Sequence, residues 1–154
     1  MVRNISGREL RIYRDTLMAL MGHILVTLYG EEALDALSDW LYNKRKEEWK
    51  ERSKTIKDKS PEFFLRFFSN EAHEYEVIRK DKNVLEVKVY KCIHAEVFKK
   101  LNATEIGYKL ICRGDDAATE GFNPKIRLIR PKILMRGDDC CHFIWKLEEE
   151  ETKG

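Results

Sequence analysis

The side chains with the widest chemical scope in this sequence are four cysteines, all beyond residue 90. Cys92 falls at the predicted end of a strand and directly before a helix, where the partial positive charge of the helix N-terminus would favour a thiolate. Cys112 lies inside the next predicted helix, with Asp115 three and Asp116 four residues later, a spacing that puts at least one carboxylate on the same helical face as the thiol. A carboxylate there can orient a histidine, ligate a metal or act as a general base. Each cysteine could equally be a small buried hydrophobe.

The stretch 137–143 holds two aspartates, two cysteines and one histidine, the densest group of reactive side chains in the chain. Side chains alternate along a strand, so only one of Cys140 and Cys141 can face the core. Aromatic residues two and four positions further on favour Cys141. Asp138 is a candidate general base, and His142 a candidate proton shuttle.

The cysteine spacing is not that of a zinc ribbon, because there is no paired C-x-x-C arrangement. A mixed site that combines Cys92, Cys112 and Cys141 with a carboxylate or a histidine stays open. Zinc or iron is therefore the metal that the pattern allows, and no cofactor is required by it. The sequence has no Gly-rich phosphate loop, no G-x-S-x-G elbow and no H-E-x-x-H motif, so nucleotide, lipase and zincin chemistries are set aside.

A helical N-terminal part is expected to position these groups. Apolar residues recur at spacings of three and four over residues 6–29, which places them on one helical face. They are Leu10, Tyr13, Leu17, Leu20, Met21, Ile24 and Leu28. Ser6 and Glu9 form a capping-box pattern, and Gly30 is expected to end the helix.

Two more helices are predicted before residue 70. Residues 31–52 form the second, with these side chains turned inward: Ala33, Leu34, Leu37, Trp40 and Leu41. Residues 61–69 form a third, short one with four phenylalanines. Such a segment could line a ligand site, although a core or interface plug is the more usual outcome.

From Ala72 the apolar period changes to two, which is typical of strands with one wet face. The expected elements are a hairpin with its turn at 81–83, helices over 94–101 and 104–121 (the latter capped by Thr104), and a hairpin over 125–147 with its turn at 136–139. The predicted fold class is α+β, with N-terminal helices packed on an antiparallel sheet made of two β-hairpins separated by two helices. Residues 1–154 are expected to be a single domain, with a helical part (1–70), a hairpin-helix-helix-hairpin part (72–147) and a charged tail (148–154).

Composition and charge limit the kinds of molecule that this chain is expected to bind. Lys+Arg 29 against Asp+Glu 27 leaves a net charge of +2, which argues against a nucleic-acid footprint. No run approaches the roughly 20 apolar residues of a membrane span, and the N-terminus lacks the layout of a signal peptide. A cytoplasmic location is therefore expected, where thiols rather than disulfides are the default.

A series of short motifs in the C-terminal half resembles the L-2-amino-thiazoline-4-carboxylic acid hydrolase family over residues 87–147. The motifs are Cys92-x-x-Ala95-x-x-Phe98, Glu105-x-Gly107, Ile111-Cys112-x-x-Asp115, Gly121-Phe122-Asn123-Pro124, Leu128-x-Arg130 and Gly137-Asp138-x-x-Cys141-x-Phe143. The resemblance implies hydrolytic opening of a thiazoline ring to give N-carbamoyl-cysteine. It places the family's recurrent residues on Cys92, Cys112, Asp115, Asp138 and Cys141. His142 departs from the pattern, because the family commonly has an acidic residue there.

Three functions remain open from the sequence. In the first, a hydrolase acts on a small cyclic amidine or amide: Cys112 or Cys141 attacks the C=N carbon, or Asp115 or Asp138 activates water. His94 or His142 then moves the proton. The candidate ligand-binding residues are Cys92, His94, Asn123 and His142. The second function is a non-catalytic domain that binds a small molecule, a metal or a cofactor. The third is a subunit of an assembly, and a homodimer is one form it could take.

Overall fold

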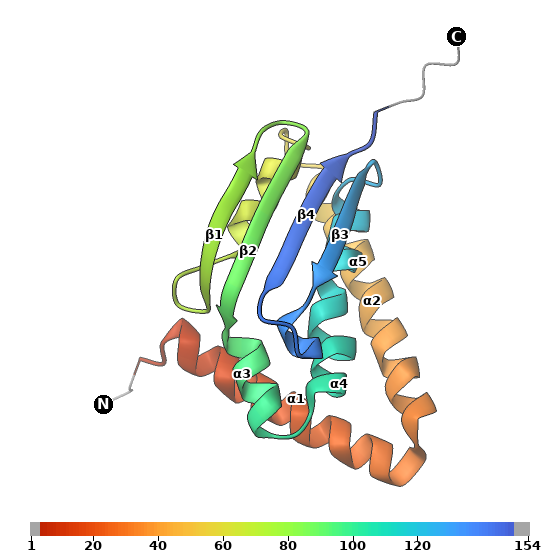
Figure 1. The fold of residues 1–154 in the computed structure, drawn as a ribbon. Coiled ribbons are helices and arrows are strands. Elements are labelled where there is room, and N and C mark those ends of the chain that lie inside the picture. Colours follow the sequence, from red (N-terminus) through yellow and green to blue (C-terminus); the bar gives the residue numbers. More distant parts are fainter. Residues whose placement is uncertain (1–3, 150–154) are drawn as a thin grey trace.

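The computed structural model describes residues 4–149, which form α-helices and a four-stranded antiparallel sheet (Figure 1). The helices are α1 (Gly7–Tyr29), α2 (Glu31–Ser53), α3 (Ile93–Lys100), α4 (Thr104–Gly107) and α5 (Arg113–Phe122). Shorter helical segments are η1 (Pro61–Phe67), η2 (Tyr108–Cys112) and η3 (Leu134–Arg136). The strands are β1 (His73–Lys80), β2 (Val84–Cys92), β3 (Ile126–Lys132) and β4 (Cys141–Leu147). The predicted fold class is confirmed.

The sheet has the order β1-β2-β4-β3, so the two predicted hairpins meet along β2 and β4. In that central pair Val87 lies opposite Phe143, and Val89 lies opposite Cys141. The first hairpin turns where the sequence predicts, because the Asp81 carboxylate accepts hydrogen bonds from the backbone N–H groups of Asn83 and Val84. The second turn is looser and contains η3.

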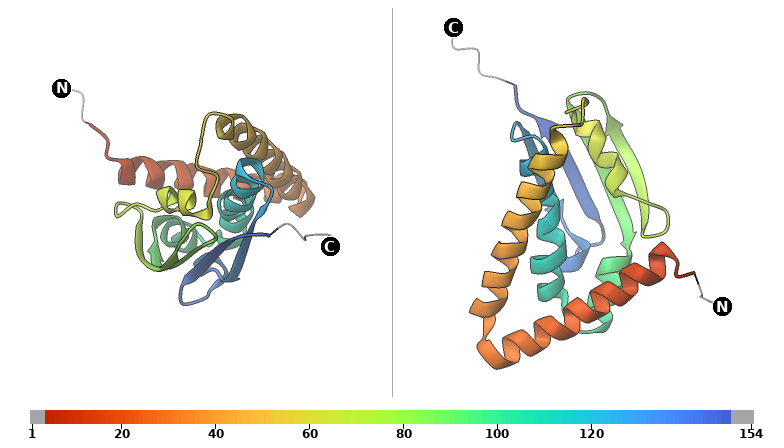
Figure 2. Two further views of the ribbon diagram at one scale, coloured as in Figure 1. Left: turned by 90° about the horizontal axis from the view of Figure 1, so that it is seen from above. Right: turned by 180° about the vertical axis from the view of Figure 1, so that it is seen from behind.

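The helices lie on one side of the sheet, with η1 and α5 next to the strands and α2 behind them (Figure 2). Aromatic rings join these layers: Phe64 of η1 stacks on Trp145 of β4 with their centroids 5.1 Å apart. Phe63 stacks in turn on Phe122 of α5 at 4.4 Å. Phe63 and Phe64 are buried, as expected if this segment fills part of the hydrophobic core. No helix among residues 4–149 is long and apolar enough to cross a membrane.

Helix α1 has the predicted ends but an unexpected orientation. The capping box is present, with Ser6 Oγ accepting from the Glu9 backbone N–H at 3.1 Å, and the helix stops at Gly30. The seven apolar side chains share one face, and that face is exposed: the accessible fraction runs from 41% at Leu17 to 66% at Met21. The buried residues of α1 are Asp15, Ala19 and Gly22.

Three local predictions are wrong. Trp40 is 59% exposed, because it lies off the stripe that buries Leu34, by about a third of a helical turn. The Pro61 segment is a 3-10 helix that ends at Phe67. Thr104 is not a cap, since Ala103 occupies that position without a side-chain hydrogen bond.

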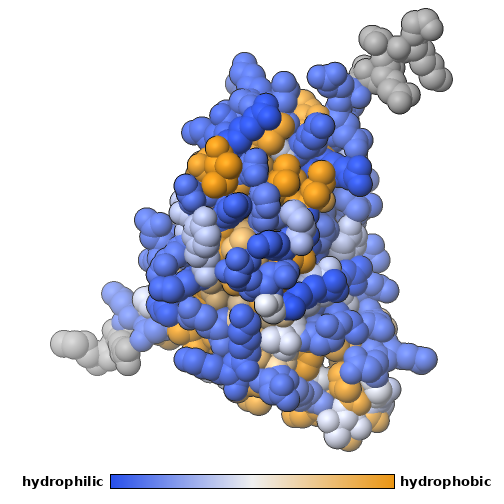
Figure 3. Space-filling model, in the orientation of Figure 1, coloured by the Kyte–Doolittle hydropathy of each residue, from blue (hydrophilic) through white to orange (hydrophobic). Residues whose placement is uncertain are grey.

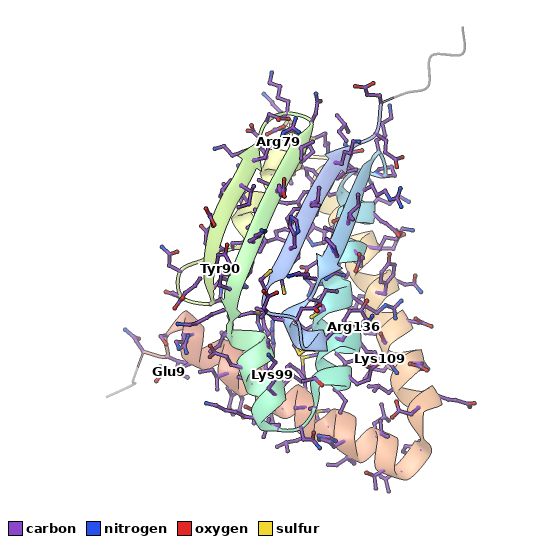
Figure 4. All side chains as sticks on the ribbon, viewed as in Figure 1. Glu9, Arg79, Tyr90, Lys99, Lys109 and Arg136 are labelled. Atoms are coloured by element: carbon purple, nitrogen blue, oxygen red, sulfur yellow. The ribbon has the colours of Figure 1, made fainter. Side chains whose placement is uncertain are left out.

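The predicted helix over 104–121 is interrupted by the π-turn η2, which inserts extra backbone between α4 and α5. Lys109 extends from this turn toward α2 and pairs with Asp35 at 2.7 Å (Figure 4). Arg136 of η3 covers the Tyr108 ring at 3.6 Å. The turn ends on Cys112, so its extra residue sets the direction in which that thiol points.

The contact between α5 and α2 requires a glycine. A methyl group at Gly121 would overlap the backbone carbonyl oxygen of Lys46 in α2, and it would lie 3.0 Å from Trp49 Cβ. Because the obstruction is backbone, no side-chain rotation can relieve it. Gly114, on the same helix, has nothing nearer than 3.7 Å.

We expect Gly121→Ala to lower the free energy of unfolding by about 1–3 kcal/mol through overpacking. Gly114→Ala is the matched control, and it should gain up to about 1 kcal/mol of helix propensity. Urea unfolding monitored by circular dichroism measures both. Equal effects of the two substitutions would contradict the close α2–α5 contact.

Candidate functional site

A cavity of about 360 Å³ lies at the end of β2 and β4, between the sheet and the helices. That volume falls in the range of small-molecule sites. Its polar lining comes from all four strands and from α1, α2, α3, η2 and α5. It consists of Arg11, Arg14, Arg45, His73, Cys92, His94, Cys112, Asp115, Arg130 and Cys141. Its aromatic lining consists of Trp49, Phe67, Phe68 and Phe143. The Phe-rich segment thus serves both the core and the cavity wall.

Five of the predicted site residues line this one cavity: Cys92, Cys112, Cys141, Asp115 and His94. They come from β2, η2, β4, α5 and α3, so only the folded chain assembles them.

The other three predicted site residues are engaged elsewhere. Asp138 accepts a hydrogen bond from the Ile133 backbone N–H at 2.8 Å and so shapes the β3–β4 connection. Asn123 donates its side-chain amide to the Lys59 carbonyl at 2.9 Å. His142 of β4 lies 2.7 Å from the carboxylate of Glu86 on the neighbouring strand β2. None of the three lines the cavity.

Cys92 lies immediately before α3, as predicted. Burial raises the pKa of its thiol, although hydrogen bonds from the backbone N–H groups of Ala95 and His94 oppose this. The helix N-terminus therefore moderates the effect of burial without reversing it. At neutral pH the Cys92 thiol is protonated.

The other two thiols are further from ionising. Burial, with Asp115 next, raises the pKa of Cys112 well above its usual value. Burial also raises the pKa of Cys141 to about 12, although its sulfur accepts a hydrogen bond from the Leu134 backbone N–H at 3.2 Å. Cys141 faces the core, as alternation along β4 predicts. All four cysteines are free, which agrees with the expected thiols.

Asp115 is a cavity carboxyl group with a raised pKa. Burial raises its pKa to about 6, and the charge of Arg130 opposes that rise from 3.5 Å. Arg130 is itself only 6% exposed and also binds Asp116 and the Cys112 carbonyl, the latter at 2.9 Å. The carboxylate of Asp115 is therefore ionised at pH 7 but retains appreciable basicity.

A buried carboxylate that the sequence analysis missed orients His94. Asp15 of α1 is fully buried, and its Oδ2 lies 2.5 Å from His94 Nδ1, while Arg14 Nη2 lies 2.8 Å from its Oδ1. Burial disfavours the charged form, but the hydrogen bonds and charges of His94 and Arg14 outweigh it and lower the pKa of Asp15. With Nδ1–H donating to Asp15, Nε2 is the ring nitrogen left for other partners.

Four arginines of the lining were also missed as site residues. Arg130 was noted only as part of a motif, yet it occupies the same strand face as Ile126 and Leu128, where a charged residue needs a partner. The alternation of side chains along β3 could therefore have identified Arg130 as a candidate site residue from the sequence. Arg11, Arg14 and Arg45 sit on two long helices whose many other charges gave no reason to single them out.

No group of three or more His, Cys, Asp or Glu side chains in the part of the chain described here is arranged to hold a metal ion. Cys92, Cys112 and Cys141 share the cavity as separate lining residues.

Comparison with known proteins identifies a family. The chain matches the model of the L-2-amino-thiazoline-4-carboxylic acid hydrolase family over residues 8–145. The match includes α1 and α2, so it extends far beyond residues 87–147, where the short motifs lie. No curated protein matches. Among solved structures, trafficking protein particle complex subunit 3 from Naegleria fowleri, covalently bound to palmitic acid, is similar with a TM-score of 0.41 and 16% identity, covering 89% of this chain and 96% of that chain.

Fold and family match together define a hydrolase-like α+β domain. The chain belongs to the L-2-amino-thiazoline-4-carboxylic acid hydrolase family.

The raised pKa of Asp115 predicts a pH-dependent loss of stability. A carboxyl group whose pKa rises on folding stabilises the fold while protonated, and that contribution is lost as the pH climbs from 3.8 toward about 6. Asp115→Asn should therefore match the wild type near pH 4 and be more stable at pH 7, by up to about 3 kcal/mol. Urea unfolding across this range measures the difference.

Asp139→Asn is the control, because Lys132 lowers the pKa of Asp139 and no gain at pH 7 is expected. A stability difference for Asp115→Asn that stays constant with pH would contradict the raised pKa of this carboxyl group.

Proposed function

We propose that this domain hydrolyses a small cyclic amidine or amide that carries a carboxylate, of the thiazoline type, inside the cavity. The observation that carries the proposal is the convergence of Asp115, His94 and three thiols on one arginine-lined cavity. The family match supports the reaction class.

The charge of the lining selects an anion. Arg11, Arg14, Arg45 and Arg130 line the cavity together with a single carboxylate, Asp115. Guanidinium groups bind carboxylates through paired hydrogen bonds, which fix orientation as well as charge. The aromatic walls suit the flat, apolar part of a small ring.

Asp115 is the group we assign as general base. At pH 7 a carboxyl group of pKa about 6 is mostly ionised, whereas a thiol of pKa 9 or above is at most about 1% thiolate. Asp115 therefore activates water far more readily than Cys112 or Cys141 becomes a nucleophile. The thiols are assigned to shaping and contacting the ligand.

Water then adds to the ring carbon of the C=N bond, and the bond from that carbon to the ring sulfur breaks. Asp115 takes one proton from the water, and the oxygen ends as the carbonyl of a carbamoyl group. The two protons of water end on the ring nitrogen and on the departing sulfur. His94, held by Asp15, is assigned to deliver the proton to the leaving atom, the role that an oriented histidine fills in acid–base catalysis.

A binding module is the alternative function. The specific observation in its favour is that burial keeps all three cavity thiols protonated, which suits contact rather than nucleophilic attack. Either role needs reduced cysteines, as a reducing cytosol provides, so a cytoplasmic location is part of the proposal.

The first test is turnover of L-2-amino-thiazoline-4-carboxylate, followed by chromatography of the thiol product from pH 5 to 10. We expect kcat/KM to rise between about pH 5 and 7 with an apparent pKa of about 6, which is that of Asp115. Asp115→Asn should lose at least about 100-fold in kcat/KM. Cys112→Ser and Cys141→Ser should stay within about 10-fold of the wild type, since no thiolate is formed.

A rate that keeps rising above pH 9 and disappears in Cys112→Ser would replace the carboxylate mechanism with a thiolate one. Binding of the same compound in calorimetry without turnover would favour the binding module. Neither binding nor turnover across cyclic amidines and amides, with and without a carboxylate, would overturn the proposal.

His94→Gln tests the proton-transfer role, because the glutamine amide can still donate to Asp15 but cannot titrate. We expect kcat to fall by about 100-fold with KM little changed, and added imidazole to restore part of the rate. His142→Gln, paired to Glu86 outside the cavity lining, is the matched control and should be unaffected. Loss without imidazole rescue, together with an altered circular dichroism spectrum, would assign His94 a structural role instead.

A further inference from the structure

Helix α1 presents its apolar stripe to solvent. The stripe consists of the seven residues Leu10, Tyr13, Leu17, Leu20, Met21, Ile24 and Leu28, each at least 41% exposed. In Figure 1, α1 crosses the lower end of the molecule, and hydrophobic side chains appear along that lower edge in Figure 3. A contiguous exposed stripe of this kind marks an interaction surface.

We propose that this stripe is the interface of a homodimer in which the α1 helices of two copies pack antiparallel across a twofold axis. This inference does not rest on the proposed function.

The spacing of the stripe is nearly the same when it is read from either end. In an antiparallel pair centred between Leu17 and Met21, Leu10 of one copy lies opposite Leu28 of the other, and Tyr13 lies within one residue of Ile24. A twofold interface requires such self-complementarity, since the same surface serves both copies. Rows of residues three and four apart interdigitate when two helices pack.

Charge favours the antiparallel arrangement. Every Asp, Glu, Lys and Arg of α1 lies in its N-terminal half, and residues 16–30 contain none. Antiparallel packing places the charged end of each α1 next to the uncharged end of its partner. It also brings the basic first turns near the acidic start of α2, Glu31 and Glu32.

The available area fits a dimer. A helix of 23 residues is about 35 Å long and about 11 Å across. Its exposed half therefore presents on the order of 600 Å², and two copies would bury about 1,200 Å², the lower bound for specific interfaces. A lipid surface would instead favour lysines and arginines along both flanks of the stripe, and its C-terminal half has none.

The test is sedimentation velocity of the full chain over a range of about 1 to 100 µM, because buried area alone does not fix the affinity. We expect the mass of a dimer for the wild type. Leu17→Glu, near the twofold axis, places two like charges close together and should weaken the dimer at least about 100-fold. Met21→Glu, where the side chain is 66% exposed, is a second variant that leaves the fold intact even if Leu17→Glu does not.

Ile78→Glu is the matched control, because Ile78 is 44% exposed, similar to Leu17, and lies on β1 away from α1. It should remain dimeric. A wild-type monomer at every concentration, or a dimer that survives both α1 substitutions, would overturn the proposal. So would a monomer that binds neutral phosphatidylcholine vesicles, since that assigns the stripe to lipid.

Discussion

The buried carboxylate of Asp15 is the constraint on which the cavity depends. A charge removed from water is stable only when its partners are close and well aligned, and here Arg14 and His94 supply them. These contacts tie α1 to the start of α3, next to the end of β2. Ala19 and Gly22 continue the same buried face of the helix. A methyl group at Gly22 would lie 2.5 Å from Ile106 Cγ2, so the close approach that buries Asp15 needs small residues there.

In this arrangement α1 has one face that packs against the fold and a second, apolar face that is exposed to solvent. The side that meets the fold buries Asp15, Ala19 and Gly22 and packs only Met18 and Val26 against the core. The side that meets solvent carries the seven large apolar residues of the stripe, contrary to the usual amphipathic pattern. The ion pairs of Asp15 with Arg14 and His94 help to hold α1 in position, and the seven apolar side chains of the stripe stay exposed. Because Arg11 and Arg14 of this helix line the cavity, a partner packed on the outer face would also restrain two of its arginines.

Local sequence patterns correctly predicted the features that depend only on residues close together in the chain. Alternation along β4 placed Cys141 toward the core, and the strand-to-helix boundary placed Cys92 before α3. The orientation of α1 could not be read in this way, because a helix buries whichever face its neighbours accept. Asp15 and His94 are 79 positions apart, so no spacing rule joins them. The π-turn that ends on Cys112 was also beyond prediction, since it breaks the 3.6-residue period on which helix assignment rests.

The arginines of the cavity have two different tasks, and this limits how a carboxylate ligand can bind. Arg130 and Arg45 are the cations that lower the pKa of Asp115 against the effect of burial. A ligand carboxylate bound at Arg130 would add a like charge beside Asp115 and raise its pKa further, turning a base into a protonated acid at pH 7. Binding at Arg11 and Arg14 avoids this conflict. The proposed reaction therefore requires the ligand to hold its carboxylate toward α1 and its reacting carbon toward α5, which places that carbon between Asp115 and His94.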